Sequence, residues 1–314
     1  MTLLTASTPR STRRSRQATD TPPAAPSRAR SKTPTRSPKT KSMTKSMIKS
    51  MTKSTKASPK DDFGALPPLA LPASLLLLTA FSYYIQGGGQ PPTIDWCEIN
   101  NTHTSHVKEF FNCLSMLPWI ISSAFGTYRA FSRSAHPWAK TAFSLSLSIA
   151  VGSYLFHAYL TRFTQALDEL PMLWLGLHST ALFYKMTNVP ATKPLQAHSA
   201  IILIAGSSVI TLLYTLSTNY EAFLLPYAGL TVATFLFLLR NILVNKNPFM
   251  KAWGLTGFLS MLLGATLWSI ELHTCRDHLK LHACWHLAVG VATYAVISYA
   301  SINLLGTKQQ TFLL

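Results

Sequence analysis

The sequence predicts an all-α membrane protein, a seven-transmembrane helix bundle with an additional N-terminal apolar segment. First, the chain of 314 residues is 48% apolar and only 12% charged. Second, apolar stretches of roughly 17 to 25 residues, long enough to cross a bilayer, recur through most of it. Third, successive membrane-spanning helices would place their connecting loops alternately on the two sides of the membrane, and the Lys and Arg residues of these loops are more numerous on one side. This imbalance indicates how the bundle is oriented in the membrane.

Residues 1–62 are predicted to be a disordered basic tail rich in Ser, Thr, Lys and Arg. Fifteen of the 28 Lys and Arg lie in the first 60 residues, where Asp20 is the only acid. The low-complexity run KSMTKSMIKSMTKST at 41–55 lacks the apolar side chains that ordering requires. The tail is compatible with an organelle-targeting presequence, although a solvated cytosolic tail near anionic lipid is preferred. The rest of the chain shows no basic groove with interleaved aromatics, so no nucleic acid partner is expected.

Residues 63–90 are predicted to be an apolar anchor, or an extra transmembrane segment, followed by a linker. Their apolar part at 69–86, LALPASLLLLTAFSYYIQ, is short and contains Pro72, so a signal anchor, a cleaved signal and an interfacial segment all remain open. Residues 91–307 form the body, and 308–314 a C-terminal tail. The seven helices of the body are expected near 111–131, 141–160, 167–187, 198–217, 222–241, 253–272 and 283–305.

The charge pattern orients this bundle. If the basic tail is cytosolic and 69–86 crosses the membrane, nine Lys and Arg of the body and C-terminal tail lie on the cytosolic side and four on the lumenal side. The same topology places Cys97 and Cys275 together on the oxidising side, where a disulfide is permitted. The four cysteines contain no CxxC pair, which excludes a zinc ribbon or a thioredoxin-like motif.

Histidines, acids and a serine gather at the lumenal helix ends. His282 and His286 are four residues apart, so both side chains lie on one helix face and can meet one metal ion. Ser153 and His157 are also four apart, and Asp168 follows at the beginning of the next helix. The other histidines are not grouped with candidate metal ligands or catalytic residues, and they are expected at the surface or in loops: His103, His106, His136, His178, His198, His273 and His278.

Three histidines and an open position form the ligand set of a catalytic zinc, which lowers the pKa of a bound water to about 7. Asp168 can then act as general base toward that water, and Ser153 can donate to the oxyanion formed on an attacked carbonyl. For the pair His282 and His286 alone, packed core histidines and haem ligands are open alternatives.

The stretch IDWCEINNTHTSHVKEFFN at 94–112 carries a second set of polar groups. Carboxylate, amide and backbone carbonyl oxygens are the ligands that calcium prefers, but their spacing is not that of an EF-hand. From composition alone, a solvated acidic turn that caps the helix starting near Glu109 is preferred over a cation site. The candidate oxygen ligands are Asp95, Trp96 through its carbonyl, Glu98, Asn100 and Glu109.

In order and spacing, three blocks resemble the alkaline ceramidases. These blocks are DWCEIN with EFFN, then GSYLFHAYLTRFTQALDELPMLW, then WSIELHTC to LHACWHLAVGVATY, and the resemblance covers 93–305. The family consists of seven-helix intramembrane amidohydrolases, and its superfamily includes adiponectin and progestin-type receptors. The chain departs from the family at two positions. Glu271 stands where the family has an aspartate, and Cys284 stands in the motif HACWH, which reads HAWWH in the family.

The resemblance implies hydrolysis of ceramide, taken from the bilayer, to a sphingoid base and a fatty acid. It implies a multi-pass protein of the endoplasmic reticulum or Golgi, with the tail cytosolic and the metal sites lumenal. A receptor with the same zinc core and little turnover is the alternative, which the DWCEIN block disfavours. The implied roles are zinc binding by His157, His282 and His286, catalysis by Ser153 and Asp168, calcium binding by Asp95, Trp96, Glu98, Asn100 and Glu109, and a disulfide between Cys97 and Cys275.

Overall fold

The computed structural model describes residues 89–133, 135–188 and 197–305, together with the single positions 74, 77 and 81. Apart from those positions, the predicted segment 69–86 lies outside the described residues, as do the predicted tails 1–62 and 308–314. Within the described ranges the chain forms α-helices, one short 3₁₀ turn and no strands, which confirms the predicted all-α class. The helices are α3 (Phe110–Ser132), α4 (Pro137–Tyr159), α5 (Arg162–Asn188), α6 (Ala197–Leu216), α7 (Glu221–Val244), α8 (Pro248–Thr274) and α9 (Leu281–Leu305), with η2 (Asp277–Leu279) between the last two.

Local signals set the helix ends. At the start of α4, the His136 side chain accepts a hydrogen bond from Trp138 N at 3.2 Å, and Pro137 occupies the first turn, where a missing N–H costs nothing. Asn247 and Pro248 begin α8 in the same way. Both helices end at a left-handed residue, Leu160 with φ 49° and Cys275 with φ 39°.

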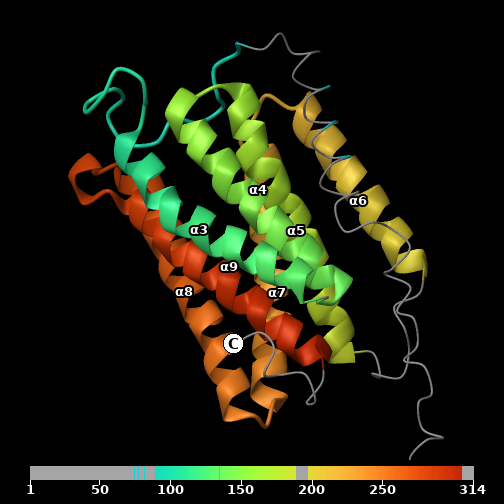
Figure 1. The fold of residues 1–314 in the computed structure, drawn as a ribbon. Helices are drawn as coiled ribbons and strands as arrows, with labels where there is room; N and C mark the ends of the chain where they lie inside the picture. The colour runs from blue at the N-terminus through green and yellow to red at the C-terminus, as the bar shows by residue number, and fades with distance from the viewer. Residues whose placement is uncertain are drawn as a thin grey trace, which may run out of the picture. The chain divides into compact units, whose positions relative to one another are not determined.

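The helices pack as a bundle around α9. This helix contacts α8, α3 and α4, while α5 contacts α4, α7 and α6 (Figure 1). The far half of the core, away from the 94–109 segment, is built from large buried side chains such as Trp138, Phe183 and Tyr299. His178 also lies in this region, 5% exposed and stacked on Trp138 with 5.6 Å between ring centroids. The expectation that His178 lies at the surface or in a loop is therefore wrong.

The outer faces of the helices are apolar. Five of the described helical segments are long and apolar enough to cross a membrane: α3, α4, α7, α8 and the η2–α9 segment. Helix α5 falls outside this group, because its first half holds Arg162, Asp168 and Glu169 and its second half contains further polar residues such as His178 and Lys185. Large exposed apolar side chains in mid-helix indicate a surface that faces lipid. They include Ile121, Leu213, Leu225, Leu236 and Val291.

Candidate metal centre

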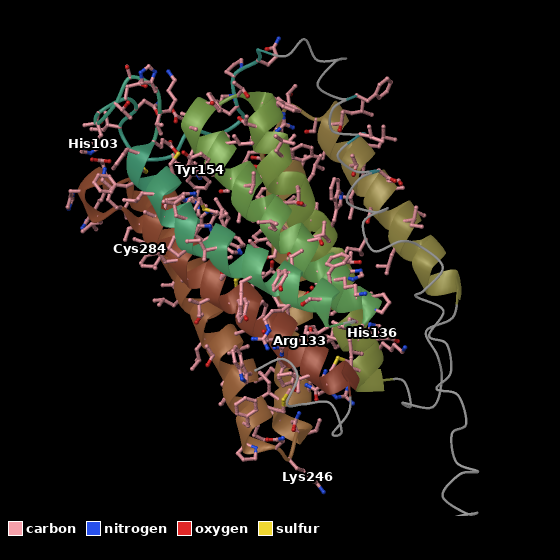
Figure 2. All side chains as sticks on the ribbon, viewed as in Figure 1. His103, Arg133, His136, Tyr154, Lys246 and Cys284 are labelled. Carbon is pink, nitrogen blue, oxygen red and sulfur yellow. A yellow bond between two sulfur atoms is a disulfide. The ribbon has the colours of Figure 1, made fainter. Side chains whose placement is uncertain are left out.

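Three buried histidines meet at one end of the bundle. His157 lies in the last turn of α4, and His282 and His286 lie in the first two turns of α9. Their exposed fractions are 0%, 4% and 2%, and one nitrogen from each ring lies within 4.8 Å of the others. Cys284, between the two histidines of α9, and Tyr154, next to Ser153, lie toward the end that carries His103, whereas Lys246 marks the opposite end (Figure 2).

Each histidine has a polar group beside its Nδ1. Glu109 Oε2 pairs with His157 Nδ1, and Glu271 Oε2 lies 3.2 Å from His282 Nδ1. Ser115 Oγ lies 2.8 Å from His286 Nδ1. Because the Ser115 hydroxyl already donates to the carbonyl of Asn112 at 2.7 Å, the histidine is the donor in this pair. The hydrogen-bonded partners of His157 and His286 fix the ring orientation and leave Nε2 as the lone-pair nitrogen that a metal ion requires. The Glu271 carboxylate is close to His282 Nδ1 but makes no hydrogen bond to it in this structure.

These residues fit a metal ion. His157 Nε2 is buried with no hydrogen-bond partner in the structure, an arrangement that a bound cation would satisfy. Glu109 and Glu271 are 0% and 3% exposed, and buried carboxylates beside neutral imidazoles favour a nearby positive charge. Among the residues that the structure describes, the histidine triad is the group of His, Cys, Asp and Glu side chains close enough to share an ion.

Ser153 and Asp168 lie beside the triad. The Ser153 hydroxyl, one turn before His157 on α4, hydrogen-bonds to the Asp168 carboxyl group on α5. Gly152 brings the two helices together here, because a Cβ atom at this position would lie 2.2 Å from the carbonyl oxygen of Leu167. The structure therefore brings together all five residues predicted for zinc binding and catalysis.

Two cavities adjoin this group. The smaller, about 30 Å³, is lined by Ser153, Asp168, His282 and His286 and by several aromatic rings. The larger, about 90 Å³, is mostly apolar, with four Ser and Thr hydroxyls in its lining, and extends between α3, α4, α5, α7, α8 and α9. Trp119, Met172 and Tyr227 line both, so they lie between the two cavities.

The acidic 94–109 segment lies directly over the triad. The Trp96 ring stacks on His282 with 3.9 Å between centroids. Glu98 is 6% exposed, and its two carboxylate oxygens accept from the backbone N–H groups of Phe111 at 2.7 Å and Asn112 at 2.9 Å. Glu98 thus caps α3, as the acidic-turn interpretation expects, but this residue is buried and not solvated.

The other candidate calcium ligands lie nearby. Asn100 Nδ2 is 3.4 Å from Asp95 Oδ2. Desolvation raises the pKa of the Asp95 carboxyl group, and the adjacent Glu109 carboxylate adds to this effect. Asp95 and Glu109 are therefore close enough to interact. Asp95, Glu98 and Glu109 do not form a second group with the tight spacing of the histidines in the described part of the chain.

A disulfide joins Cys97 to Cys275, with 5.2 Å between the Cα atoms. Cys97 follows Trp96, and Cys275 is the C-cap of α8, one turn after Glu271. The bond therefore links the segment that covers His282 to the helix that carries the carboxylate beside it.

A buried network anchors the same segment to α5. Gln165 Nε2 donates to Thr93 Oγ1 at 2.7 Å and to Glu169 Oε1 at 2.9 Å. Arg162 donates to the Tyr214 hydroxyl at 2.7 Å, and that hydroxyl donates to Glu169 Oε2 at 2.6 Å. The supporting roles of Ser115, Gln165 and Tyr214 are absent from the sequence-based prediction, because each partner lies on another helix and no local spacing signals it.

The chain is similar to known proteins over the whole of this region. A family model described as Ceramidase matches residues 88–312. Alkaline ceramidase 3 of Mus musculus is 29% identical over 229 residues, covering 68% of this chain and 84% of the relative. Alkaline ceramidase of Drosophila melanogaster is 24% identical, covering 68% and 77%. Alkaline ceramidase YPC1 of Saccharomyces cerevisiae is 27% identical, covering 67% and 76%.

Proposed function

Because the chain belongs to the ceramidase family, whose model matches residues 88–312, we propose that it is an alkaline ceramidase, a hydrolase that cleaves the amide bond of ceramide. One observation carries the proposal: three buried histidines converge beside Ser153 and Asp168 on a single pocket within the matched region. The overall reaction adds water to the amide, breaks the bond between carbonyl carbon and nitrogen, and yields a fatty acid and a sphingoid base.

The substrate is a membrane lipid. The exposed apolar helix faces support a protein embedded in the bilayer, from which ceramide would enter. The mostly apolar cavity of about 90 Å³ offers a place for part of a hydrocarbon chain, and Met172 and Tyr227 lie between it and the polar pocket. The amide would then lie beside the histidines while the chains remain among apolar side chains.

The cation in this proposal is zinc, held by His157, His282 and His286. Three nitrogen ligands with an open position are typical of catalytic zinc, whereas magnesium and calcium prefer oxygen ligands. When bound, zinc supplies a Lewis acid that makes water nucleophilic near neutral pH. Glu109, Glu271 and Ser115 hold the three rings in position through their Nδ1 atoms.

Asp168 transfers the proton, and Ser153 stabilises the negative charge that develops on the carbonyl oxygen. Asp168 accepts a proton from the attacking water and delivers it to the leaving nitrogen, so that the amine departs without forming an unstable anion. Ser153 donates its hydroxyl hydrogen toward the carbonyl oxygen as negative charge develops there. Their mutual hydrogen bond supports a shared location at the reacting atoms.

Calcium is proposed to stabilise the 94–109 segment. Its proposed ligands are Asp95, the Trp96 carbonyl, Glu98, Asn100 and Glu109. The interaction of Asp95 with Glu109 and the pairing of Glu109 with His157 support a link between the two sites. A cation here would fix the segment whose Trp96 ring covers His282. Calcium would therefore modulate hydrolysis and take no part in bond cleavage.

The proposed location is the endoplasmic reticulum or the Golgi, with the metal sites lumenal. The disulfide between Cys97 and Cys275 supports an oxidising compartment on that side. We further propose that residues 91–307 form the catalytic domain and that 1–62 remain cytosolic, with 63–90 as the connecting anchor.

A ceramide panel tests the proposal. Purified wild-type protein and His286→Ala are assayed for release of free sphingoid base, with and without calcium. His273→Ala is the matched control, because His273 is exposed and its ring contacts only the carbonyl of Ser269 on its own helix, at 2.7 Å. We expect wild type and His273→Ala to be active and His286→Ala to be inactive at equal expression. Full activity of His286→Ala would refute the site, and a zinc-loaded wild type without turnover would favour a receptor.

A further inference from the structure

The pocket beside the triad has aromatic walls that face in different directions. Trp96 stands nearly perpendicular to Tyr220, at 85° with 6.5 Å between centroids. Trp96 is also tilted by 51° from Trp268, at 6.4 Å. These rings do not form a parallel stack, and all three line the cavity of about 30 Å³. A cavity of this size holds a few water-sized groups, so the space suits a small head group and not a hydrocarbon chain.

The charge of this pocket favours a cation. Asp168 and Glu169 line it together with the aromatic rings, and no Lys or Arg is among the described residues that line it. His282 and His286 also line it, and the buried carboxylates of Glu109 and Glu271 would offset the two positive charges of a zinc ion bound there. The nearby Arg162 is bound to Tyr214 and lies 3.9 Å from Glu169, so it offsets Glu169 and not Asp168. The face of an aromatic ring carries partial negative charge and attracts ammonium groups. A carboxylate among several aromatic rings is therefore complementary to a small ammonium ion.

The four groups come from four separate parts of the chain. Trp96 belongs to the 94–109 segment, Asp168 to α5 and Trp268 to α8, while Tyr220 immediately precedes α7. Trp268 additionally packs on Trp285 with 5.9 Å between centroids. Rings that are fixed by neighbouring rings in this way form a rigid wall, which reduces the entropy lost when a ligand binds.

We propose that Trp96, Tyr220, Trp268 and Asp168 bind the ammonium group of the released sphingoid base. This inference rests on the proposed hydrolysis, because the breaking amide bond would lie beside Asp168. The nitrogen becomes a primary amine as that bond breaks and is protonated near neutral pH, as an alkyl amine is. The substrate amide is neutral and gains little from the aromatic walls, so the pocket distinguishes product from substrate. The free base would remain bound and inhibit the enzyme.

Equilibrium binding to the metal-loaded, full-length protein tests this site without turnover. The probes are a radiolabelled sphingoid base and a neutral analogue in which a hydroxyl replaces the amine. For wild type we expect the base to bind roughly three- to thirtyfold more tightly than the neutral analogue, the range that cation–π contacts provide. In Trp268→Leu this ratio should fall measurably, because one of the three rings is lost, whereas Trp268→Phe, which retains a ring, should keep most of it. Tyr220→Leu and Tyr220→Phe form a second pair should Trp268→Leu not fold.

Equal binding of the two probes by wild type, or an unchanged ratio in both leucine variants, would overturn the ammonium site. Neither outcome would affect the proposed hydrolysis, which is tested separately by release of base from ceramide. Conversely, a protein that binds the base selectively but never produces it would contradict the hydrolase and leave an ammonium-lipid site in place.

Discussion

At the residue scale, the partners of the three histidines differ in kind. His157 and His282 lie beside carboxylates, Glu109 and Glu271, while His286 lies beside the hydroxyl of Ser115. A carboxylate raises the basicity of the imidazole that it contacts and so strengthens its bond to a metal ion, whereas a neutral hydroxyl mainly orients the ring.

Replacement of Glu271 should therefore weaken metal binding without removing a ligand. We expect Glu271→Gln to lower zinc affinity by roughly 10- to 100-fold and Ser115→Ala to have a smaller effect in the same direction. Zinc retained by the purified protein during dialysis against graded chelator concentrations measures both. Ser122→Ala is the matched control on α3, because its hydroxyl bonds only to the carbonyl of Trp119 on its own helix, at 3.1 Å. Wild-type zinc retention by Glu271→Gln would show that this carboxylate does not support His282.

At the element scale, the contact of α4 with α5 sets the geometry of Ser153 and Asp168. Gly152 immediately precedes Ser153, and Leu167 immediately precedes Asp168. A Cβ at Gly152 would lie 2.2 Å from the Leu167 carbonyl oxygen and 2.9 Å from the Asp168 nitrogen, both backbone atoms. Since no side chain can rotate to relieve this overlap, a larger residue must push the two helices apart.

Gly152→Ala should consequently reduce both stability and activity. We expect a destabilisation of at least about 1–3 kcal/mol, the cost of overpacking a well-packed interior, and loss of most hydrolysis because Ser153 and Asp168 separate. The midpoint of thermal unfolding in detergent and the ceramide assay measure the two effects. Gly229→Ala is the control, because this exposed helical glycine has nothing within 4 Å of an added Cβ and should be neutral or slightly stabilised. Equal unfolding midpoints and equal hydrolysis for the two variants would show that neither stability nor activity requires the close approach of α4 and α5 at Gly152.

The length of the apolar stretches predicts the presence of the seven helices well. It predicts the helix ends poorly where a helix continues beyond its apolar stretch. The helix predicted at 253–272 begins at Pro248, because Asn247 and the proline form a polar start signal outside that stretch. The spacing of His282 and His286 predicts a shared ligand face because a helix repeats every 3.6 residues. Contacts between helices, such as His178 stacking on Trp138, depend on tertiary packing that no local pattern encodes.

At the scale of the whole molecule, the two ends of the described bundle differ in chemistry. The end near His103 carries the disulfide, the acidic segment and the histidine triad, and the end near Lys246 carries large apolar core residues (Figure 2). A disulfide persists in an oxidising compartment, and Lys and Arg in short loops favour the cytosol. Both arguments support the proposal that the triad lies on the lumenal side.

Cysteine labelling in sealed microsomes, whose outer surface is cytosolic, tests this orientation. Ser105→Cys and Lys246→Cys place single thiols at exposed positions in the 94–109 segment and between α7 and α8. Both are made in a Cys284→Ser background, because Cys284 is an exposed free thiol and Cys113 is buried. We expect a membrane-impermeant maleimide to label Lys246→Cys in intact vesicles and Ser105→Cys only after detergent opens them. Labelling of Ser105→Cys in intact vesicles, with Lys246→Cys protected, would invert the orientation and leave the disulfide on the reducing side.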